Sequence, residues 1–381
     1  MGEYIRGVVV RLHVTPEQEV EFKKNYGCTR KTYNELLSKY KAEHGEDSIE
    51  IPTQKELNQF LKETKKELLY LKETESTSLQ QARDDLHKAF KNSFKSKRHN
   101  PPKFHSKKKT RPSFRQTIRK DKRPVEKNTL TLRKHGKVTF STSVEYLDLL
   151  NSPDTKFNNI TVYYDGLNHY ASFNIETDAP EQLPLTGEHI GCDINSNKNG
   201  WLVTSEGQKE FFDVDHDNQM IKHINRLISK CRNMSRRWKK LQKRLQKWYN
   251  KRTNQLNDYI EKLTYNLVKK YDTIVFEENY STIKILIGGE ENMIFPLSRF
   301  IKRLKDKFQL YKPEADGVQF VKPHNTSRTC HHCGHINKEL KVKTRNWKCP
   351  KCGKILDRDI NAAINILNRW FNGDGLIKYL N

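Results

Sequence analysis

Apolar and polar positions in the first part of the chain follow two different periods. Residues 7–14 alternate, which is typical of a strand, and the alternation stops just before Pro16, a residue type that often opens a helix. Apolar residues then recur at helical spacing in three groups as far as Lys91. This pattern predicts one strand followed by a small helical bundle.

A second group of strands is predicted after the helices. Residues 159–164 and 169–176 have strand patterns, and the turn-forming residues 165–168 between them favour a hairpin. Together with the first strand, these segments predict a small β-barrel that the helical segment interrupts. Residues 178–184 have the composition of a linker to the second half of the chain.

The second half is predicted to mix strands and helices. An apolar strand at 189–193 has a hairpin partner at 200–204, and a long helix begins at about Asp217. A further helix at 256–270 leads into a strand at 273–276. The long helix has a seam of apolar residues at alternating spacings of four and three, which we interpret as core or helix-pairing surface: Leu227, Cys231, Met234, Trp238, Leu241, Leu245 and Trp248.

The composition adds a strong positive charge. The 381 residues include 71 lysines and arginines against 46 acids, a formal net charge of +25, and 34% of the residues are apolar. On a chain long enough for two or three domains, such a charge indicates a polyanionic partner; a merely basic protein is the alternative.

Membrane and secreted proteins fit the sequence poorly. No stretch approaches the roughly 18–20 consecutive apolar residues of a membrane-spanning helix. The first residues contain an apolar run that is too short and interrupted for a signal peptide. The seven cysteines do not resemble a secreted disulfide framework. We therefore expect a cytoplasmic protein, associated with the nucleoid of a prokaryotic host.

Two segments concentrate the positive charge. Residues 91–127 hold fifteen basic residues and two acids, interleaved with Phe94, Phe104 and Phe114. Cations for phosphates and rings for bases are what single-stranded nucleic acid requires, whereas a solvated or disordered tail is the alternative. The long helix carries the second set. The candidate nucleic-acid-binding residues are Lys107, Lys108, Lys109, Arg111, Arg236, Arg237, Lys239, Lys240, Lys243 and Arg244.

Four cysteines near the C-terminus predict a metal site. Cys330 and Cys333 form one C-x-x-C pair and Cys349 and Cys352 another, with fifteen residues between the pairs and a glycine after each. This arrangement is typical of a tetrahedral zinc ribbon in which four thiolates leave no position for water, so the zinc is expected to be structural. A redox pair or incidental cysteines are the alternatives.

Carboxylates from distant segments form a third signal. Asp193 ends one apolar strand, Glu277 and Glu278 end another, and Asp357 and Asp359 precede a helical run at the end of the chain. Strand ends of an α/β sheet can bring such groups together. In a strongly basic chain, hard oxygen ligands at one place are consistent with phosphodiester cleavage by two Mg²⁺ ions.

The chain resembles the TnpB family of transposon-encoded RNA-guided DNA nucleases, which is related to the smallest type V CRISPR effectors. The resemblance covers nearly the whole chain. In the second half it rests on Gly191-Cys-Asp193-Ile-Asn, Glu277, Thr326-Ser-Arg-Thr-Cys330-x-x-Cys333, Cys349-x-x-Cys352-Gly and Leu356-Asp-Arg-Asp359-Ile-Asn361-Ala-Ala-Ile-Asn365-Ile. In the first half it rests on Tyr26-Gly27, Arg30-x-x-Tyr33-Asn34 and Pro102-Lys-Phe-His-Ser-Lys.

This resemblance implies an α+β multidomain protein. Residues 1–14 and 125–180 would form a wedge-like β-barrel, and 15–124 a helical recognition insertion. Residues 186–325 and 354–381 would form a RuvC-like nuclease with a ribonuclease H fold, and 326–353 the inserted zinc ribbon. The implied Mg²⁺ ligands are Asp193, Glu277 and Asp359, with Glu278 as the alternative to Glu277.

The leading interpretation is therefore an RNA-guided, Mg²⁺-dependent DNA endonuclease. Its partners would be a guide RNA and a double-stranded target DNA that pairs with it, with no preference for an oligomeric state. Base pairing would read the sequence, while the protein reads a short motif and the shape of the duplex. A miniature CRISPR effector, a nuclease-derived DNA-binding regulator and a transposase are the other readings; an intact set of carboxylates argues against the regulator.

Overall fold

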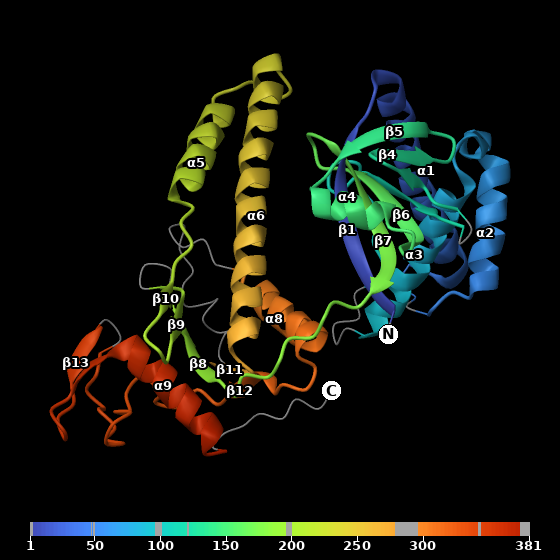
Figure 1. Cartoon of the computed structure of the whole chain (residues 1–381). Helices are drawn as coiled ribbons and strands as arrows, with labels where there is room; N and C mark the ends of the chain where they lie inside the picture. The colour runs from blue at the N-terminus through green and yellow to red at the C-terminus, as the bar shows by residue number, and fades with distance from the viewer. Residues whose placement is uncertain are drawn as a thin grey trace. The chain divides into compact units, whose positions relative to one another are not determined.

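The computed structural model describes residues 3–46, 48, 50–95, 101–119, 122–195, 200–278, 296–341 and 344–373. The chain divides into two compact units, Met1–Ala179 and Pro180–Asn381 (Figure 1). Both units contain helices and a sheet, so the expected α+β multidomain class is confirmed. Among the described helices, none is both long and apolar enough to cross a membrane.

The first unit is built on an antiparallel sheet of seven strands in the order β2-β6-β7-β1-β5-β4-β3. Its strands are β1 (Glu3–His13), β2 (Ser113–Thr117), β3 (Val125–Glu126), β4 (Thr129–Leu132), β5 (Gly136–Ser141), β6 (Lys156–Tyr164) and β7 (His169–Asp178). The hairpin predicted around residues 165–168 is confirmed as β6 and β7. The sheet curls, so that Gln116 on the edge strand β2 exchanges two 3.2 Å hydrogen bonds with the backbone of Arg133, which follows β4.

The helices of this unit follow β1, as the apolar pattern predicts. They are α1 (Pro16–His44), α2 (Gln54–Glu67), the 3₁₀ helix η1 (Leu69–Glu73) and α3 (Ser76–Lys95); α4 (Val144–Asn151) lies between β5 and β6. Thr15 and Gln18 form a capping box that starts α1, and Thr53 and Glu56 do the same for α2. The N-terminal turns of α1 pack Phe22 into the core of the sheet, and its later turns pack Leu36 into the helical core. One helix thus joins both cores.

The second unit contains a mixed sheet of five strands in the order β10-β9-β8-β11-β12. Its strands are β8 (His189–Ile194), β9 (Leu202–Thr204), β10 (Lys209–Glu210), β11 (Thr273–Glu277) and β12 (Gly317–Val321). The predicted strands at 189–193, 200–204 and 273–276 are confirmed by β8, β9 and β11. Strands β8, β11 and β12 run parallel, so their carboxyl ends share one edge of the sheet.

Helices cover both faces of this sheet. α6 (Arg236–Lys270) and α8 (Leu297–Tyr311) pack on the face that includes Ile190, Ile274 and Phe276. α9 (Arg358–Phe371) packs on the opposite face, where Ile366 meets Val275. A short hairpin of β13 (Asn346–Lys348) and β14 (Ile355–Asp357) leads directly into α9 (Figure 1).

The long helix predicted from Asp217 is not continuous. It is divided into α5 (Asp215–Ser229) and α6, because Met234 adopts a left-handed conformation with φ of 64° and Ser235 caps the new helix. Ile224 of α5 packs against Leu245 of α6, so the two helices form a hairpin. The seam thus pairs α6 with its own neighbour, and the separate helix predicted at 256–270 is the continuation of α6.

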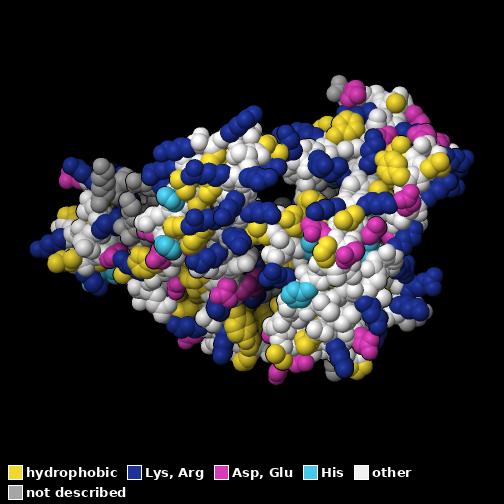
Figure 2. All heavy atoms as spheres, turned by 90° about the horizontal axis from the view of Figure 1, so that it is seen from above, with side chains coloured by type: hydrophobic (Ala, Val, Ile, Leu, Met, Phe, Trp, Pro, Cys, Tyr) yellow, Lys and Arg dark blue, Asp and Glu magenta, His cyan; other side chains and the backbone are white. Residues whose placement is uncertain are grey.

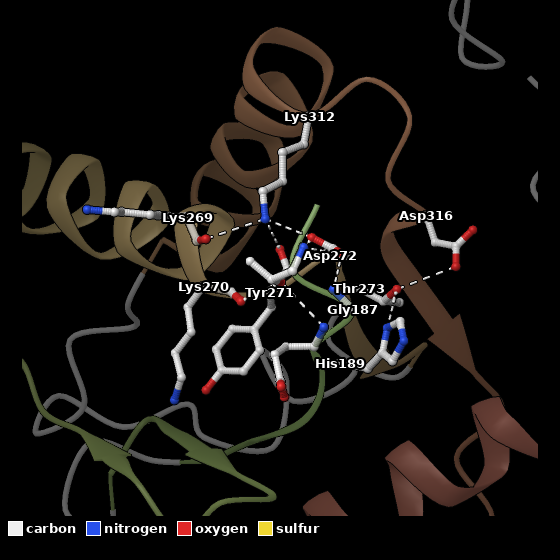
Figure 3. A network of polar contacts seen from close by, with 11 residues as sticks. Gly187, His189, Lys269, Lys270, Tyr271, Asp272, Thr273, Lys312 and Asp316 are labelled. Atoms are coloured by element: carbon white, nitrogen blue, oxygen red, sulfur yellow. Dashed lines mark hydrogen bonds and ion pairs between the residues drawn. The ribbon is translucent and has the colours of Figure 1, made fainter. Parts of the chain in front are cut away.

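A buried ion pair anchors the chain where it enters the second unit (Figure 3). The side chain of Lys312, which is 0% exposed, places its Nζ 2.7 Å from Oδ1 of Asp272. Asp272 Oδ2 also accepts hydrogen bonds from the backbone nitrogens of Thr186 and Gly187 at 2.8 and 2.7 Å. Burial tends to raise the pKa of Asp272, but these donors, Lys312 first, hold it below its usual value. The pair ties the entering chain to the ends of α6 and α8.

Breaking this pair should destabilise the second unit. Asp272→Ala leaves the Lys312 ammonium buried without its carboxylate, which we expect to cost about 3–5 kcal/mol of unfolding free energy. All five tryptophans follow residue 180, so tryptophan fluorescence during urea unfolding reports on this unit alone. The matched control is Asp258→Ala, which breaks the exposed Lys262–Asp258 pair and should cost less than about 1 kcal/mol. Equal effects of the two variants would contradict the prediction.

Candidate functional site

Two of the candidate carboxylates end neighbouring parallel strands. Asp193 lies at the end of β8 and Glu277 at the end of β11. Successive side chains of a strand alternate between the two faces, and Cys192 and Phe276 belong to the core under α6 and α8. Asp193 and Glu277 therefore lie on the other face, which α9 covers, and at the same edge of the sheet.

The third carboxylate comes from α9, which lies unusually close to β8. A Cβ atom added to Gly191 would fall 2.1 Å from the carbonyl oxygen of Ala363 and 2.9 Å from Cβ of Leu367. Only glycine leaves space for the helix at this position. The close packing holds the first turn of α9, with Asp359, above the strand end that carries Asp193.

The electrostatics of the site show that the three carboxylates influence one another. Burial, then the charges of Glu277 and Asp359, raise the pKa of Asp193 to about 8, although a 2.8 Å hydrogen bond from Asn195 opposes the shift. Burial also raises the pKa of Glu277 and of Asp359. Since like charges in a partly desolvated site repel, a bound cation would stabilise all three carboxylates together.

Two of these carboxylates have a partner from another segment. The Thr326 hydroxyl donates a hydrogen bond to Oε1 of Glu277. Nη1 of Arg345 lies 2.9 and 3.1 Å from the two oxygens of Asp359, whose residue is 3% exposed. Thr326 belongs to the stretch that carries the family resemblance, but its contact with Glu277 had no signal in the sequence, and neither did the role of Arg345.

The alternative acids have other positions. Asp357 caps α9, because its Oδ1 accepts from the backbone nitrogens of Asp359 and Ile360 at 2.9 and 3.1 Å. Its Oδ2 lies 2.8 Å from Lys209, and although burial opposes the shift, these contacts hold its pKa below the usual value. Glu278 is exposed, and its backbone nitrogen bonds to Val321. The repulsion that acts on Asp193 comes from Glu277 and Asp359.

The four cysteines form one cluster. The sulfurs of Cys330, Cys333, Cys349 and Cys352 all lie within 4.8 Å of one another. Both knuckles have the same backbone geometry: the glycine after each adopts a positive φ and donates its N–H to the first cysteine of the pair at 2.9 Å. Four convergent thiols with no carboxylate among them are the donor set that zinc prefers in closed sites. The cluster could therefore hold a structural zinc ion.

The basic stretch 91–127 is in part a docked segment. Residues 96–100 and 120–121 and the side chain of Phe94 lie outside the described residues. His105 stacks on Tyr33 of α1 at 3.8 Å, and its backbone exchanges two hydrogen bonds with Asn34. The contacts thus join two motifs that are far apart in the sequence, one containing Tyr33-Asn34 and the other His105. Where it is described, this stretch is not a free tail.

The docked segment presents the predicted cations at the surface. Lys107, Lys108 and Lys109 are exposed in a turn that a hydrogen bond from Thr110 to Ser106 closes. The guanidinium of Arg111 lies over the ring of Tyr163 at 3.6 Å. The expected base-stacking role of Phe114 is wrong, because this side chain is 1% exposed and belongs to the core of the sheet. Phe104 remains 51% exposed.

The cations predicted on the long helix lie on α6. Arg236, Arg237, Lys239, Lys240, Lys243 and Arg244 are all exposed. Among the residues that the structure describes, no acid forms an ion pair with any of the six. Figure 2 shows lysine and arginine side chains over much of the face that it views. Unpaired cations at this density are suited to a polyanion.

Three family models match separate parts of the chain. A family model described as "Probable transposase" matches residues 172–283, and one described as "Cas12f1-like, TNB domain" matches 298–366. A third, described as "Helix-turn-helix domain", matches residues 1–48, of which the described part forms β1 and α1.

Curated relatives extend these matches over most of the chain. A provisionally named RNA-guided DNA endonuclease of Streptomyces pristinaespiralis is 28% identical over 96% of this chain and 90% of its own length. InsQ of Escherichia coli (strain K12), with the same provisional description, is 25% identical over 92% and 89%. A TnpB-like protein of Acanthamoeba polyphaga mimivirus is 32% identical over 44% of this chain and 31% of its own length. The chain is thus similar to proteins described as RNA-guided DNA endonucleases and as TnpB-like.

A solved structure supports the fold of this chain. The protein of a Cas12f1–sgRNA–target DNA complex superposes with a TM-score of 0.56 at 15% identity, over 96% of this chain and 99% of the other. At that identity the likeness concerns the fold. The two proteins thus share a fold across most of this chain, whereas their sequences differ widely.

Replacing a cysteine should remove zinc. Freshly purified protein is expected to contain about one zinc ion per chain by elemental analysis, and Cys330→Ser should lose it, since a closed site needs all four ligands. The melting temperature should fall as well, because the binding energy of a structural metal is folding energy. Cys231→Ser, a thiol outside the cluster, should retain the zinc. Unmodified protein without zinc would contradict the assignment.

Proposed function

We propose that this chain is a member of the TnpB family: an RNA-guided, Mg²⁺-dependent DNA endonuclease encoded by a transposon, in which Asp193, Glu277 and Asp359 bind the metal ions. The observation that carries the proposal is the convergence of three carboxylates from distant segments: burial first, and then the charges of Glu277 and Asp359, raise the pKa of Asp193 to about 8. In a chain of net charge +25, such a concentration of carboxylates is explained if they bind metal cations at the place where the nucleic acid is cut.

The residues of the site fit hard divalent cations. Carboxylate oxygens are the ligands that Mg²⁺ prefers, and the three groups approach from different directions, two from the sheet edge and one from α9. Two ions bound there would supply activation of the attacking water and stabilisation of the leaving oxygen. Within the protein, Asn195 orients Asp193 and Thr326 orients Glu277 by hydrogen bonds.

The same proposal includes the domain assignment. Residues 186–325 and 354–381 would form the RuvC-like nuclease, with 326–353 as its zinc ribbon. Residues 1–14 and 125–180 would form the wedge-like barrel and 15–124 the recognition insertion. Strand β2 requires one adjustment, since residues 113–117 lie inside the insertion but pair with β6.

We assign the contacts with nucleic acid to the exposed cations on both units. The lysine turn at 107–109, together with Arg111, would contact phosphates of the guide RNA. The exposed cations of α6, Arg236 to Arg244, would follow the backbone of the RNA–DNA heteroduplex. A protein that reads only shape and backbone needs many such cations and few base contacts, because base pairing supplies the sequence.

The metal site and the nucleic-acid surfaces should be separable by mutation. Asp193→Ala, Glu277→Ala and Asp359→Ala are each expected to abolish cleavage of a plasmid with a guide-matched target in Mg²⁺, a loss of at least about a thousandfold. Guided DNA binding, measured by gel shift of the same complex, should be largely retained, because base pairing and the cationic surfaces lie mostly outside the metal site.

The neighbouring acids are the controls for this prediction. Glu278→Ala should have little effect on cleavage. Asp357→Ala should mainly destabilise α9, by about 1 kcal/mol, since it removes a helix cap. If the unmodified protein binds guided targets but does not cut them with any divalent ion, a DNA-binding regulator replaces the nuclease. RNA that co-purifies with the protein, once sequenced, separates a transposon-derived guide from a CRISPR RNA.

The lysine turn should contribute to RNA binding through counterion release. Replacing Lys107, Lys108 and Lys109 by alanine should weaken binding and reduce the slope of log K against log salt by about two. The control variant replaces Lys23, Lys31 and Lys262 by alanine. It removes the same amount of charge, but each of these lysines already pairs with an acid four residues away. An unchanged slope in the first variant, or an equal change in both, would exclude the turn from the RNA-binding surface.

A further inference from the structure

We propose that the cysteine segment, residues 326–353, controls the carboxylate site through two positioning residues, Thr326 and Arg345. The inference deepens the proposed function, since it assumes that the carboxylates bind divalent cations. It assigns the four-cysteine cluster a role beyond its own folding: the segment that it holds together supplies a partner to two of the three carboxylates.

The first arm of this coupling is Thr326. This residue is 5% exposed and lies four positions before Cys330. Its hydroxyl donates to Glu277, so it fixes the orientation of one carboxylate oxygen and leaves the other for a cation. The position of the Thr326 hydroxyl is set by the backbone that leads into Cys330.

The second arm is Arg345, which precedes the second knuckle. Its Nη1 contacts both oxygens of Asp359, and its carbonyl accepts a 2.7 Å hydrogen bond from the backbone nitrogen of Arg358. The hairpin of β13 and β14 follows at once, pairing Asn346 with Asp357. The guanidinium is therefore held in place by the same hairpin that carries Cys349.

A buried clamp connects the first arm to α9. Asn365 donates from Nδ2 to the carbonyls of Thr326 and Thr329 at 2.8 and 2.6 Å. Asn361, which is 1% exposed, donates to the carbonyl of Thr329 at 2.8 Å and accepts from the backbone nitrogen of His331 at 3.0 Å. Asn361 and Asn365, on successive turns of α9, thus bind the backbone on both sides of Cys330.

The two arms act on cation binding in opposite directions. Thr326 orients a ligand, so it favours a cation at the site. Arg345 places a positive charge against a ligand, so it opposes one and competes for the same oxygens. General damage to the fold would weaken cation binding in either variant. Opposite signs are therefore the signature of the proposed coupling.

The test is the binding of Mn²⁺ alone to the purified full chain, followed by the electron paramagnetic resonance signal of free Mn²⁺. Thr326→Val should weaken binding by about tenfold, and Thr326→Ser, which keeps the hydroxyl, should not. Arg345→Ala should strengthen binding by about tenfold, because a positive charge leaves Asp359. Lys338→Ala, an exposed cation elsewhere in the cysteine segment, should leave the affinity unchanged.

Further variants test the clamp and the cysteines. Asn365→Ala should weaken Mn²⁺ binding as Thr326→Val does, and should add nothing in the Thr326→Val background, because both act through one contact. In Cys352→Ser, the effects of Thr326→Val and Arg345→Ala should disappear. Since that variant could unfold the segment, the opposite signs in the zinc-loaded protein decide the proposal by themselves.

The outcomes distinguish this inference from the proposed function. If Mn²⁺ binds no more tightly to the unmodified chain than to Asp193→Ala, the metal site itself is absent and the proposed function fails. If Mn²⁺ binds at the carboxylates but Thr326→Val and Arg345→Ala leave its affinity unchanged, or both weaken it, the coupling is overturned and the nuclease proposal stands.

Discussion

The close packing of α9 on β8 is the constraint on which the carboxylate site depends. At Gly191 the helix backbone occupies the space where any other residue would place a side chain. A helix held that close brings a carboxylate of its first turn to a strand end that already carries another. Burial raises the pKa of all three groups, and the charges of Glu277 and Asp359 raise that of Asp193 further. Folding thus assembles an electrostatically unfavourable cluster, which the apolar contacts on both faces of the sheet must offset.

Much of the fold could be predicted from local patterns. The sequences of strands β1, β6, β7, β8 and β11 alternate or form apolar runs, and Thr15 and Pro16 mark the start of α1. The break between α5 and α6 could not be predicted from periodicity, because the apolar seam runs on through Met234 as if the helix continued. The break serves tertiary packing: it allows the seam to fold back on itself. Strand β2 could not be predicted either, because it lies inside a stretch dominated by basic residues.

The candidate site likewise has residues that the sequence could predict and residues that it could not. Asp193, Glu277 and Asp359 could be selected because each lies at the end of a strand or the start of a helix, positions that the sequence marks. That they influence one another follows from the strand order and the packing of α9. Their partners could not be foreseen, because Arg345 and Thr326 reach the carboxylates only through the path of the cysteine segment. Such contacts leave no spacing rule in the sequence.

Strand β2 has a consequence for building chimaeras from TnpB relatives. In the sequence, the helices after β1 look like a segment that could be exchanged as a unit without changing the sheet. Yet the last part of that segment contains the edge strand β2, in which Phe114 lies in the core of the sheet and Gln116 bonds to the backbone of Arg133, beyond β4. A swap at the sequence boundary would remove this strand and open the sheet. A graft that ends at Arg111 or Pro112 keeps the strand with its own sheet, and so exchanges the helices without exposing an unpaired edge.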